Sequence, residues 1–346
     1  MNFSQALHHV MNGQSLSREE ARVAFSEIMQ GDVSPVHLAA FLTALRVKGE
    51  SVDELTGGAE ALRQAAVPVA VNAGLVLDCC GTGGDAQGSF NISSAVACVV
   101  AGAGYNVAKH GNRSVSSKSG SADVFEASGV KLEQDARSIE RILKDVGLAF
   151  LYAPAFNPAM KHAAAVRREL ATRTIFNLIG PLSNPARPQV QLIGVFDRKW
   201  LRPMAEALHD LGCRGGLVVH GHGHDELVLS GPNHVAILED GKVREVVWTA
   251  EDFGYQTQPN ASIAGGDAVR NAELLKELLG GKKGAIHDVV CMNAAALIQA
   301  ASRVERPGRA YTLKESAHAA EGSIARGAAR LKLESLIRHS RQGSIA

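Results

Sequence analysis

Glycines follow a short apolar run early in the chain, where residues 75–79 read Leu-Val-Leu-Asp-Cys and residues 81–85 read Gly-Thr-Gly-Gly-Asp. This pattern predicts a buried strand that ends in a phosphate-binding loop, because glycines let backbone N–H groups approach an anion closely. A helix is predicted over 91–103, with Asn91 among its candidate caps. The positive end of its dipole would favour an anion at the same place.

A second loop with the composition of a phosphate site follows the next predicted strand, over 105–108. Residues 109–121 read Lys-His-Gly-Asn-Arg-Ser-Val-Ser-Ser-Lys-Ser-Gly-Ser and combine three cations with five serine hydroxyls. In a parallel βαβ unit both loops emerge at the carboxyl edge of the sheet, which is the usual ligand crevice. We therefore expect the two loops to converge on one ligand that carries several phosphates.

The first loop also fits a dinucleotide-binding pattern, Gly-x-Gly-x-x-Ala over 81–86. That kind of site needs an acidic residue about 20 positions further on, which binds the ribose hydroxyls. Between Asp85 and Asp123 the sequence contains no Asp or Glu. A ligand with several phosphates is therefore favoured over a nicotinamide nucleotide.

Two adjacent carboxylates follow a histidine-rich segment, in the order His220-Gly-His222-Gly-His224-Asp225-Glu226. The alternating histidines are candidate transition-metal ligands, although the intervening glycines predict a mobile loop and no distant partner ligand is evident. Two carboxylates on a loop at the sheet edge could instead hold Mg²⁺, which prefers oxygen ligands and often bridges carboxylates to phosphates. Ordinary solvated acids are the alternative.

The composition is that of a soluble globular protein, with 346 residues, 46% of them hydrophobic, and a formal net charge of +1. This length allows two domains, and the small net charge disfavours nucleic-acid binding. The five cysteines form no C-x-x-C pair, which indicates reduced core residues of a cytoplasmic protein. We expect no export signal and no membrane span.

Strands and helices are predicted to alternate from residue 71 onward, which indicates an α/β fold with a mostly parallel sheet covered by helices. Strands are predicted over 75–79, 105–108, 148–152, 190–196 and 216–220, with a hairpin over 235–248. Residues 1–70 predict three short amphipathic helices, one of which starts at the capping box Ser17-Arg-Glu-Glu20. The expected domains are therefore 1–70, joined by helices around 155–185, and 71–346.

Three predictions concern less regular segments. Residues 177–185, Asn-Leu-Ile-Gly-Pro-Leu-Ser-Asn-Pro, predict a turn-rich link, and residues 313–337 predict one long surface helix. A helix within 154–170 carries an excess of positive charge that includes Arg167 and Arg168. That excess indicates either a solvated helix face or an anion-binding site.

Six segments together resemble the anthranilate phosphoribosyltransferase family. They are Gly81-Thr-Gly-Gly-Asp85, Asn91-Ile-Ser-Ser94, Lys109-His-Gly-Asn-Arg113, Ser119-Gly-Ser-Ala-Asp123, Arg173-Thr-Ile-Phe-Asn-Leu-Ile-Gly-Pro-Leu182 and Asp225-Glu226. The resemblance covers nearly the whole chain and implies the nucleoside phosphorylase/phosphoribosyltransferase fold. It implies transfer of phosphoribose from phosphoribosyl diphosphate (PRPP) to the amine of anthranilate, in tryptophan biosynthesis. It further implies Mg²⁺ as cofactor and a homodimer joined through the helical domain.

The resemblance also implies the site residues. Contacts to PRPP are implied for Gly81, Gly84, Asp85, Ser89, Asn91, Ile92, Ser93, Ser94, Lys109, His110, Gly111, Asn112, Arg113, Ser114, Val115, Ser116, Ser117 and Ser121. Contacts to anthranilate are implied for Gly81, Asn112 and Arg167, and ligation of Mg²⁺ for Ser93, Asp225 and Glu226. The residues expected to act in catalysis, by stabilising charge on the departing diphosphate, are Lys109, Arg113, Asp225 and Glu226.

Some positions depart from the family's pattern: Ser94 stands where Thr is usual, Asn157 replaces a His, and His222-Gly-His224 replaces Asp-Gly-Leu. The acceptor amine is neutral, so the reaction demands no strong base, and His110 is expected to have a positional role. Two alternatives are a pyrimidine nucleoside phosphorylase and a non-catalytic nucleotide-binding relative. The doubled loops and the paired carboxylates favour PRPP over phosphate, and the intact Lys-His-Gly-Asn-Arg loop argues against a non-catalytic protein.

Overall fold

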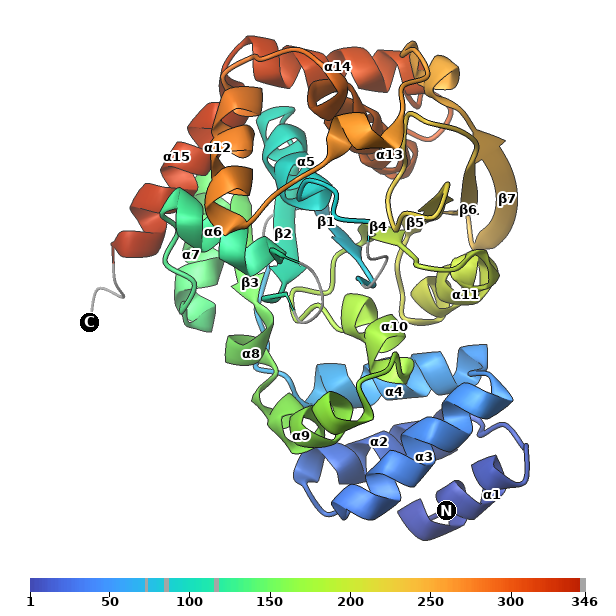
Figure 1. Ribbon diagram of the computed structural model, residues 1–346. Coiled ribbons are helices and arrows are strands. Elements are labelled where there is room, and N and C mark those ends of the chain that lie inside the picture. The colour runs from blue at the N-terminus through green and yellow to red at the C-terminus, as the bar shows by residue number, and fades with distance from the viewer. Residues whose placement is uncertain (72–73, 84–86, 115–117, 343–346) are drawn as a thin grey trace.

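A computed structural model describes residues 1–71, 74–83, 87–114 and 118–342 of the chain. A central sheet lies between helices, and a layer of N-terminal helices lies at one end of the molecule (Figure 1). Most of the strand pairs are parallel. The predicted fold class is therefore confirmed.

Within the described ranges, seven strands form one sheet in the order β3-β2-β1-β4-β5-β6-β7. The strands are β1 (Val76–Gly81), β2 (Asn106–Gly111), β3 (Leu148–Tyr152), β4 (Val190–Gly194), β5 (Gly215–Gly221), β6 (Asn233–Glu239) and β7 (Lys242–Trp248). The first five pair in parallel, and β6 and β7 continue the sheet antiparallel as the predicted hairpin. The strand order reverses between β1 and β4, and ligands of open α/β sheets bind at the carboxyl side of such a switch point.

Helices cover the α/β part of the chain. They are α5 (Ile92–Gly102), α6 (Ser121–Ser128), α7 (Ala136–Val146), α11 (Leu201–Asp210), α12 (Ala268–Leu279), α13 (Ala285–Glu305), α14 (Leu313–Ala325) and α15 (Ala328–Arg341). α5 is buried along most of its length because it packs against β1 and β2 on one side and α13, α14 and α15 on the other. By length and composition alone α13 could cross a membrane, but most of it is buried inside the protein.

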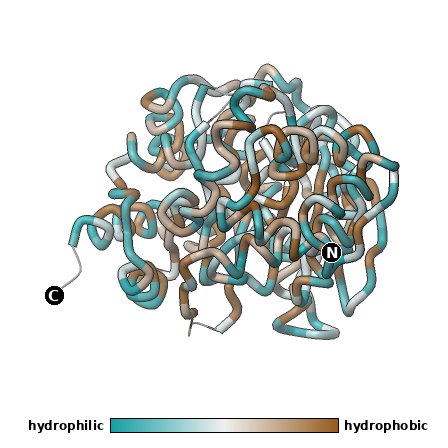
Figure 2. Tube along the Cα trace, turned by 90° about the horizontal axis from the view of Figure 1, so that it is seen from below, coloured by the Kyte–Doolittle hydropathy of each residue, from teal (hydrophilic) through white to brown (hydrophobic). Residues whose placement is uncertain are grey.

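Four helices form the N-terminal layer. They are α1 (Phe3–Met11), α2 (Arg18–Gln30), α3 (Pro35–Lys48) and α4 (Val52–Ala65). α1 was not predicted, although Asn2 and Gln5 form a capping box at its start. Hydrophobic and hydrophilic stretches alternate along the chain in the view from below (Figure 2), as expected of amphipathic helices that each bury one side. The buried sides meet at aromatic rings, including those of Phe25 and Phe41, whose centroids are 5.8 Å apart.

Two helices from the middle of the chain complete this layer. α9 (Lys161–Leu170) packs against α2 and α3, and α10 (Ile175–Leu182) packs against α4. In Figure 1 both lie directly beside the N-terminal helices. Helices from around 155–185 therefore pack on the N-terminal helices, and the division into domains 1–70 and 71–346 stays a prediction.

Two predictions about the second half of the chain are wrong. The segment 177–185 is not a turn-rich link, because α10 extends through its first part, and the backbone N–H of Thr174 donates to Asn177 Oδ1 at 3.0 Å at the start of the helix. The single helix predicted over 313–337 is two helices, α14 and α15. Gly327 separates them and adopts a φ of +71°, a left-handed conformation that ends a helix.

Candidate active site

The carboxyl ends of β1 and β4 are covered by the segment that carries Asp225. A Cβ atom at Gly81 would lie 2.4 Å from Asp225 Oδ2, and one at Gly194 would lie 1.5 Å from the Asp225 backbone oxygen. Any side chain at either position would displace this segment. The backbone N–H of Gly83 donates to Asp225 Oδ2 at 2.8 Å, so the structure joins the first glycine loop to one of the two predicted carboxylates.

The predicted Mg²⁺ ligands lie near the start of α5. The backbone N–H of Ser93 donates to Glu226 Oε1 at 3.2 Å. The preceding residue, Asp225, lies against Gly81, the last residue of β1. Hydroxyl and carboxylate oxygens are hard donors that suit Mg²⁺, which commonly takes one or two protein carboxylates and completes its shell with water and substrate phosphates. The donor set of Ser93, Asp225 and Glu226 therefore fits this ion.

Two of the three histidines before Asp225 contact oxygen atoms of neighbouring residues. His220 Nδ1 lies 2.8 Å from the Val195 carbonyl oxygen, and His222 Nδ1 lies 3.1 Å from Ser230 Oγ. Over the described ranges of the chain, no three His, Cys, Asp or Glu side chains are grouped so that they could hold a metal. The structure thus offers nothing in favour of a zinc site.

Lys109 is a buried cation, with 1% of its surface exposed. Its Nζ donates to the Cys79 carbonyl oxygen at 2.7 Å and lies 3.3 Å from Ser93 Oγ. Burying an ammonium group is costly unless oxygen atoms or opposite charges compensate it. The fold therefore holds a positive charge beside Ser93, where an anionic ligand would be stabilised.

A buried network lies around His110 and Asp78. Asp78 Oδ1 accepts from the backbone N–H of His110 at 3.2 Å, and Asp78 Oδ2 accepts from Asn184 Nδ2 at 2.8 Å. Burial raises the pKa of the Asp78 carboxyl. Burial, together with the nearby charge of Lys109, lowers the pKa of His110 to about 4. His110 is therefore neutral near pH 7, which agrees with a positional role.

Asn157 is the departure from the family's pattern that lies closest to this network. It follows the short helix α8 (Ala153–Phe156), and its Nδ2 lies 3.4 Å from His110 Nε2. Both side chains are buried. At the position where the family's pattern has a His, this chain therefore places an Asn side chain next to the ring of His110, in the second loop.

Asp123 joins Ser114 and Gly120, two residues of the second loop that we call its neck. Asp123 Oδ2 accepts from the backbone N–H groups of Ser114 and Gly120 at 3.0 and 2.8 Å. The guanidinium of Arg113 binds Asp123 and Glu126 of α6. The prediction that Arg113 contacts the diphosphate therefore stays a prediction, since this structure records carboxylate partners for it.

Asn91 connects the two loop regions. It is the N-cap residue of α5, as predicted, although its side chain makes no capping hydrogen bond to the helix. Instead, Asn91 Nδ2 donates to the Ser119 carbonyl oxygen at 3.1 Å, and Asn91 Oδ1 accepts from Asn271 Nδ2 at 2.7 Å. Two residues before Asn91, Ser89 forms an isolated antiparallel β-bridge with Ala264.

The other predicted PRPP residues lie at the ends of these elements. Ile92 and Ser94 are buried in the first turn of α5, Gly111 ends β2, and Ser121 Oγ donates to the Asn112 carbonyl oxygen at 3.4 Å. The predicted residues that lie outside the described part of the chain are Gly84, Asp85, Val115, Ser116 and Ser117.

Arg167 belongs to the helical layer, on α9. Its guanidinium carbon lies 5.3 Å from the ring centroid of Phe176, and burial lowers its pKa. In the described residues it has no carboxylate partner, and its neighbour Arg168 is exposed. A half-buried cation in this state favours an anionic ligand, because a counter-charge would offset its desolvation.

Three residues that support the site were not predicted: Asp78, Asn184 and Asn271. Asp78 had a readable signal, since a lone carboxylate in an apolar strand must find buried partners. Asn184 and Asn271 had none, because their partners are distant in sequence.

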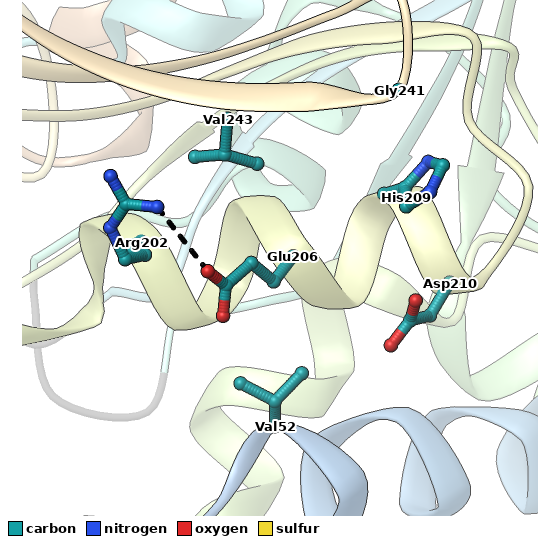
Figure 3. Close-up of a pocket in the computed structure, with 7 residues that line it drawn as sticks. All are labelled: Val52, Arg202, Glu206, His209, Asp210, Gly241 and Val243. Atoms are coloured by element: carbon teal, nitrogen blue, oxygen red, sulfur yellow. Dashed lines mark hydrogen bonds and ion pairs between the residues drawn. The ribbon is translucent and has the colours of Figure 1, made fainter.

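A pocket of about 340 Å³ lies elsewhere, between α11, the start of α4 and the turn joining β6 to β7. Figure 3 shows the ion pair between successive turns of α11, where Arg202 NH1 lies 3.4 Å from Glu206 Oε1. The lining residues are Val52, Arg202, Glu206, His209, Asp210, Gly241 and Val243. None of them is a predicted site residue.

Both the helical and the α/β part of the chain are similar to known proteins. Residues 73–330 match the glycosyl transferase family, a/b domain, and residues 4–66 match the glycosyl transferase family, helical bundle domain. Anthranilate phosphoribosyltransferase from Moorella thermoacetica is 47% identical over 329 residues, which are 95% of each chain. The chain belongs to the anthranilate phosphoribosyltransferase family.

Solved structures of this family share the fold. Anthranilate phosphoribosyltransferase from Thermus thermophilus is 43% identical with a TM-score of 0.91, over 97% of this chain and 99% of that chain. The enzyme from Saccharomyces cerevisiae, solved in complex with PRPP and Mg, is 26% identical with a TM-score of 0.87, over 98% and 97%. The family and the enzyme class predicted from the motifs are confirmed.

The lowered pKa of His110 predicts a loss of stability in mild acid. Between pH 6.5 and about 4 the unfolded chain protonates this ring and the folded chain does not, so stability falls as the pH falls. From pH 7.5 to 5.5 the wild type should lose about 1 kcal/mol more than His110→Gln. Urea unfolding at both pH values measures this. Replacement of exposed His318 by Gln is the control, and equal losses in wild type and His110→Gln would contradict the prediction.

Proposed function

We propose that this chain catalyses transfer of phosphoribose from PRPP to the amine of anthranilate, with release of diphosphate, in tryptophan biosynthesis. The observation that carries the proposal is the meeting of Asp225 and Glu226 with the first glycine loop and the start of α5. Loss of anthranilate fluorescence in the presence of PRPP and Mg²⁺ tests the reaction. Unchanged fluorescence would overturn the proposal.

The chemistry needs charge stabilisation more than proton transfer. Cleavage of the bond between ribose C1 and the diphosphate builds positive charge on the sugar and negative charge on the leaving group. Backbone N–H groups at the glycine loop, the start of α5 and the ammonium of Lys109 would stabilise the departing oxygens. The amine then gives its electron pair to C1 and releases a proton. Neutral His110 would position the reactants.

Ser93, Asp225 and Glu226 are the residues that would hold Mg²⁺. Their oxygen atoms suit this ion, and the relative from Saccharomyces cerevisiae has been solved with PRPP and Mg. When bound, the ion would neutralise charge on the leaving diphosphate. The other PRPP and anthranilate contacts implied by the resemblance complete the proposed site, apart from that of Arg113, whose guanidinium is held by Asp123 and Glu126.

A homodimer would form through the helical layer. α1 and α3 expose Met11, Val36 and Val47, whose exposed fractions are 61%, 77% and 81%. A shallow apolar pocket on the same face is lined by Met11, Ala39, Ala40, Thr43, Ala44 and Val47. Contiguous exposed apolar surface commonly marks a protein–protein contact.

The protein would act in the cytoplasm, without nucleic acid or membrane. All five cysteines are buried and free, as expected in a reducing compartment. The formal net charge of +1 gives no attraction for a polyanion. Both observations agree with a biosynthetic enzyme that acts on small molecules.

We expect turnover to require Mg²⁺ and the two carboxylates. Asp225→Asn combined with Glu226→Gln should mainly lower kcat, because the cation would no longer be held against the diphosphate. The measurement is a Mg²⁺ titration of anthranilate consumption for the wild type and the double variant. Near wild-type turnover of the variant across the titration would contradict the assignment.

Arg167 should bind the carboxylate of anthranilate. Arg167→Ala should raise the KM for anthranilate about tenfold or more, equivalent to roughly 1.5–3 kcal/mol, and leave the KM for PRPP nearly unchanged. Exposed Arg168 is the matched control, since Arg168→Ala removes the same charge one position along the helix. Similar effects from both substitutions would return Arg167 to the role of a solvated surface charge.

Charge placed on the exposed face of α3 should separate the dimer. Val47→Glu should give a monomer in light scattering, because a buried carboxylate without a partner opposes association. Val247→Glu, at a valine of β7 that is 53% exposed, is the control and should leave the mass unchanged. A dimer that survives Val47→Glu would place the contact elsewhere.

A further inference from the structure

The guanidinium of Arg113 is engaged by acidic side chains. Its NH1 donates to Asp123 Oδ1 at 3.0 Å and to Glu126 Oε2 at 2.7 Å, and its NH2 donates to Glu126 Oε1 at 2.9 Å. The same group lies 5.8 Å from the ring centroid of Tyr152. The pairing raises the pKa of Arg113 and lowers that of Glu126. Both groups are therefore charged throughout the physiological pH range.

The charge of this cluster disfavours direct phosphate binding. One cation and two carboxylates have a net charge of −1, which repels a diphosphate. Arg113 would also have to break three hydrogen bonds before it could turn to a ligand. The nearby cation Lys109 differs from Arg113 in its partners, because its Nζ donates to neutral oxygen atoms of Cys79 and Ser93.

The two oxygens of Asp123 have different tasks. Oδ2 accepts from the backbone N–H groups of Ser114 and Gly120, so one carboxylate oxygen closes both ends of the loop neck. The neck is tight, since a Cβ atom at Gly120 would lie 2.4 Å from the backbone nitrogen of Ser114. Oδ1 is held by Arg113, which is itself held by Glu126. The position of the neck therefore depends on all three side chains.

We propose that Arg113 is a positioning residue, which together with Glu126 fastens the neck of the second loop to α6 and does not itself bind the diphosphate. This role rests on the proposed function, because it assumes that PRPP binds beside Asn112 and Ser114. Asp123 is the carboxylate through which the two residues act. Glu126 thereby becomes a specific requirement for PRPP binding, although it is acidic.

The opposite role for Arg113 makes the opposite prediction for Glu126. If Arg113 bound the diphosphate, Glu126 would compete with the substrate, and Glu126→Gln would lower the KM for PRPP. Loss of a negative charge near a phosphate site acts in the same direction by simple electrostatics. Fastening of the neck predicts a higher KM, so the sign of the change separates the two roles.

The first experiment is steady-state kinetics of Glu126→Gln. The KM for PRPP should rise roughly two- to fivefold, the range expected for a partly exposed ion pair, and the KM for anthranilate should stay unchanged. Glu334→Gln on α15 is the control, since Glu334 pairs with Arg330 and is about as exposed as Glu126. A lower or unchanged KM for PRPP in Glu126→Gln would overturn the proposal.

The second experiment compares Arg113→Lys with Arg113→Ala. Lysine can bind phosphate as a point charge but cannot reproduce the guanidinium fork that joins two carboxylates. Both variants should raise the KM for PRPP equally, and recovery of affinity by lysine would overturn the proposal.

An inactive wild-type protein would overturn the proposed function instead. Calorimetric binding of diphosphate to wild type and Glu126→Gln would then decide the neck role, with weaker binding to the variant expected and equal binding contradicting it.

Discussion

Close approach of the Asp225 segment to the ends of β1 and β4 is the constraint on which the site depends. Gly81 and Gly194 permit it, because side chains at these positions would occupy the space of Asp225. With Asp225 fixed there, the next residue, Glu226, reaches the first turn of α5. Strand pairing, the glycine loop and the acidic pair thus meet where the strand order reverses, between β1 and β4.

Alternation along β2 gives neighbouring residues different chemical surroundings. Lys109 points to the face covered by α5, where it meets Ser93, whereas His110 points to the other face and meets Asn157. The first environment keeps a positive charge beside the phosphate loops, and the second keeps an imidazole neutral. Consecutive residues can therefore supply a charge and an uncharged positioning group without interfering with each other.

Local patterns in the sequence were enough for the strands and the family, because these depend on neighbouring residues. The segment Leu148–Tyr152, for example, was predicted as a strand with its actual bounds. Contacts across the fold were not readable in this way. Asn91 is of a residue type that often caps helices with its side chain. Here that side chain binds Asn271 instead, which lies 180 positions away in the sequence. The carboxylate partners of Arg113 likewise depend on how α6 packs beside the loop.

The helical layer draws its pieces from two separated parts of the chain, and this affects how the protein is made. During synthesis α1 to α4 emerge first, while α9 and α10 emerge only after β1, β2 and β3. The ring of Phe25 on α2 therefore reaches its full packing only after Phe176 on α10 has been synthesised. The N-terminal helices leave the ribosome with apolar surface uncovered, so the layer is completed only after three strands of the sheet have been synthesised.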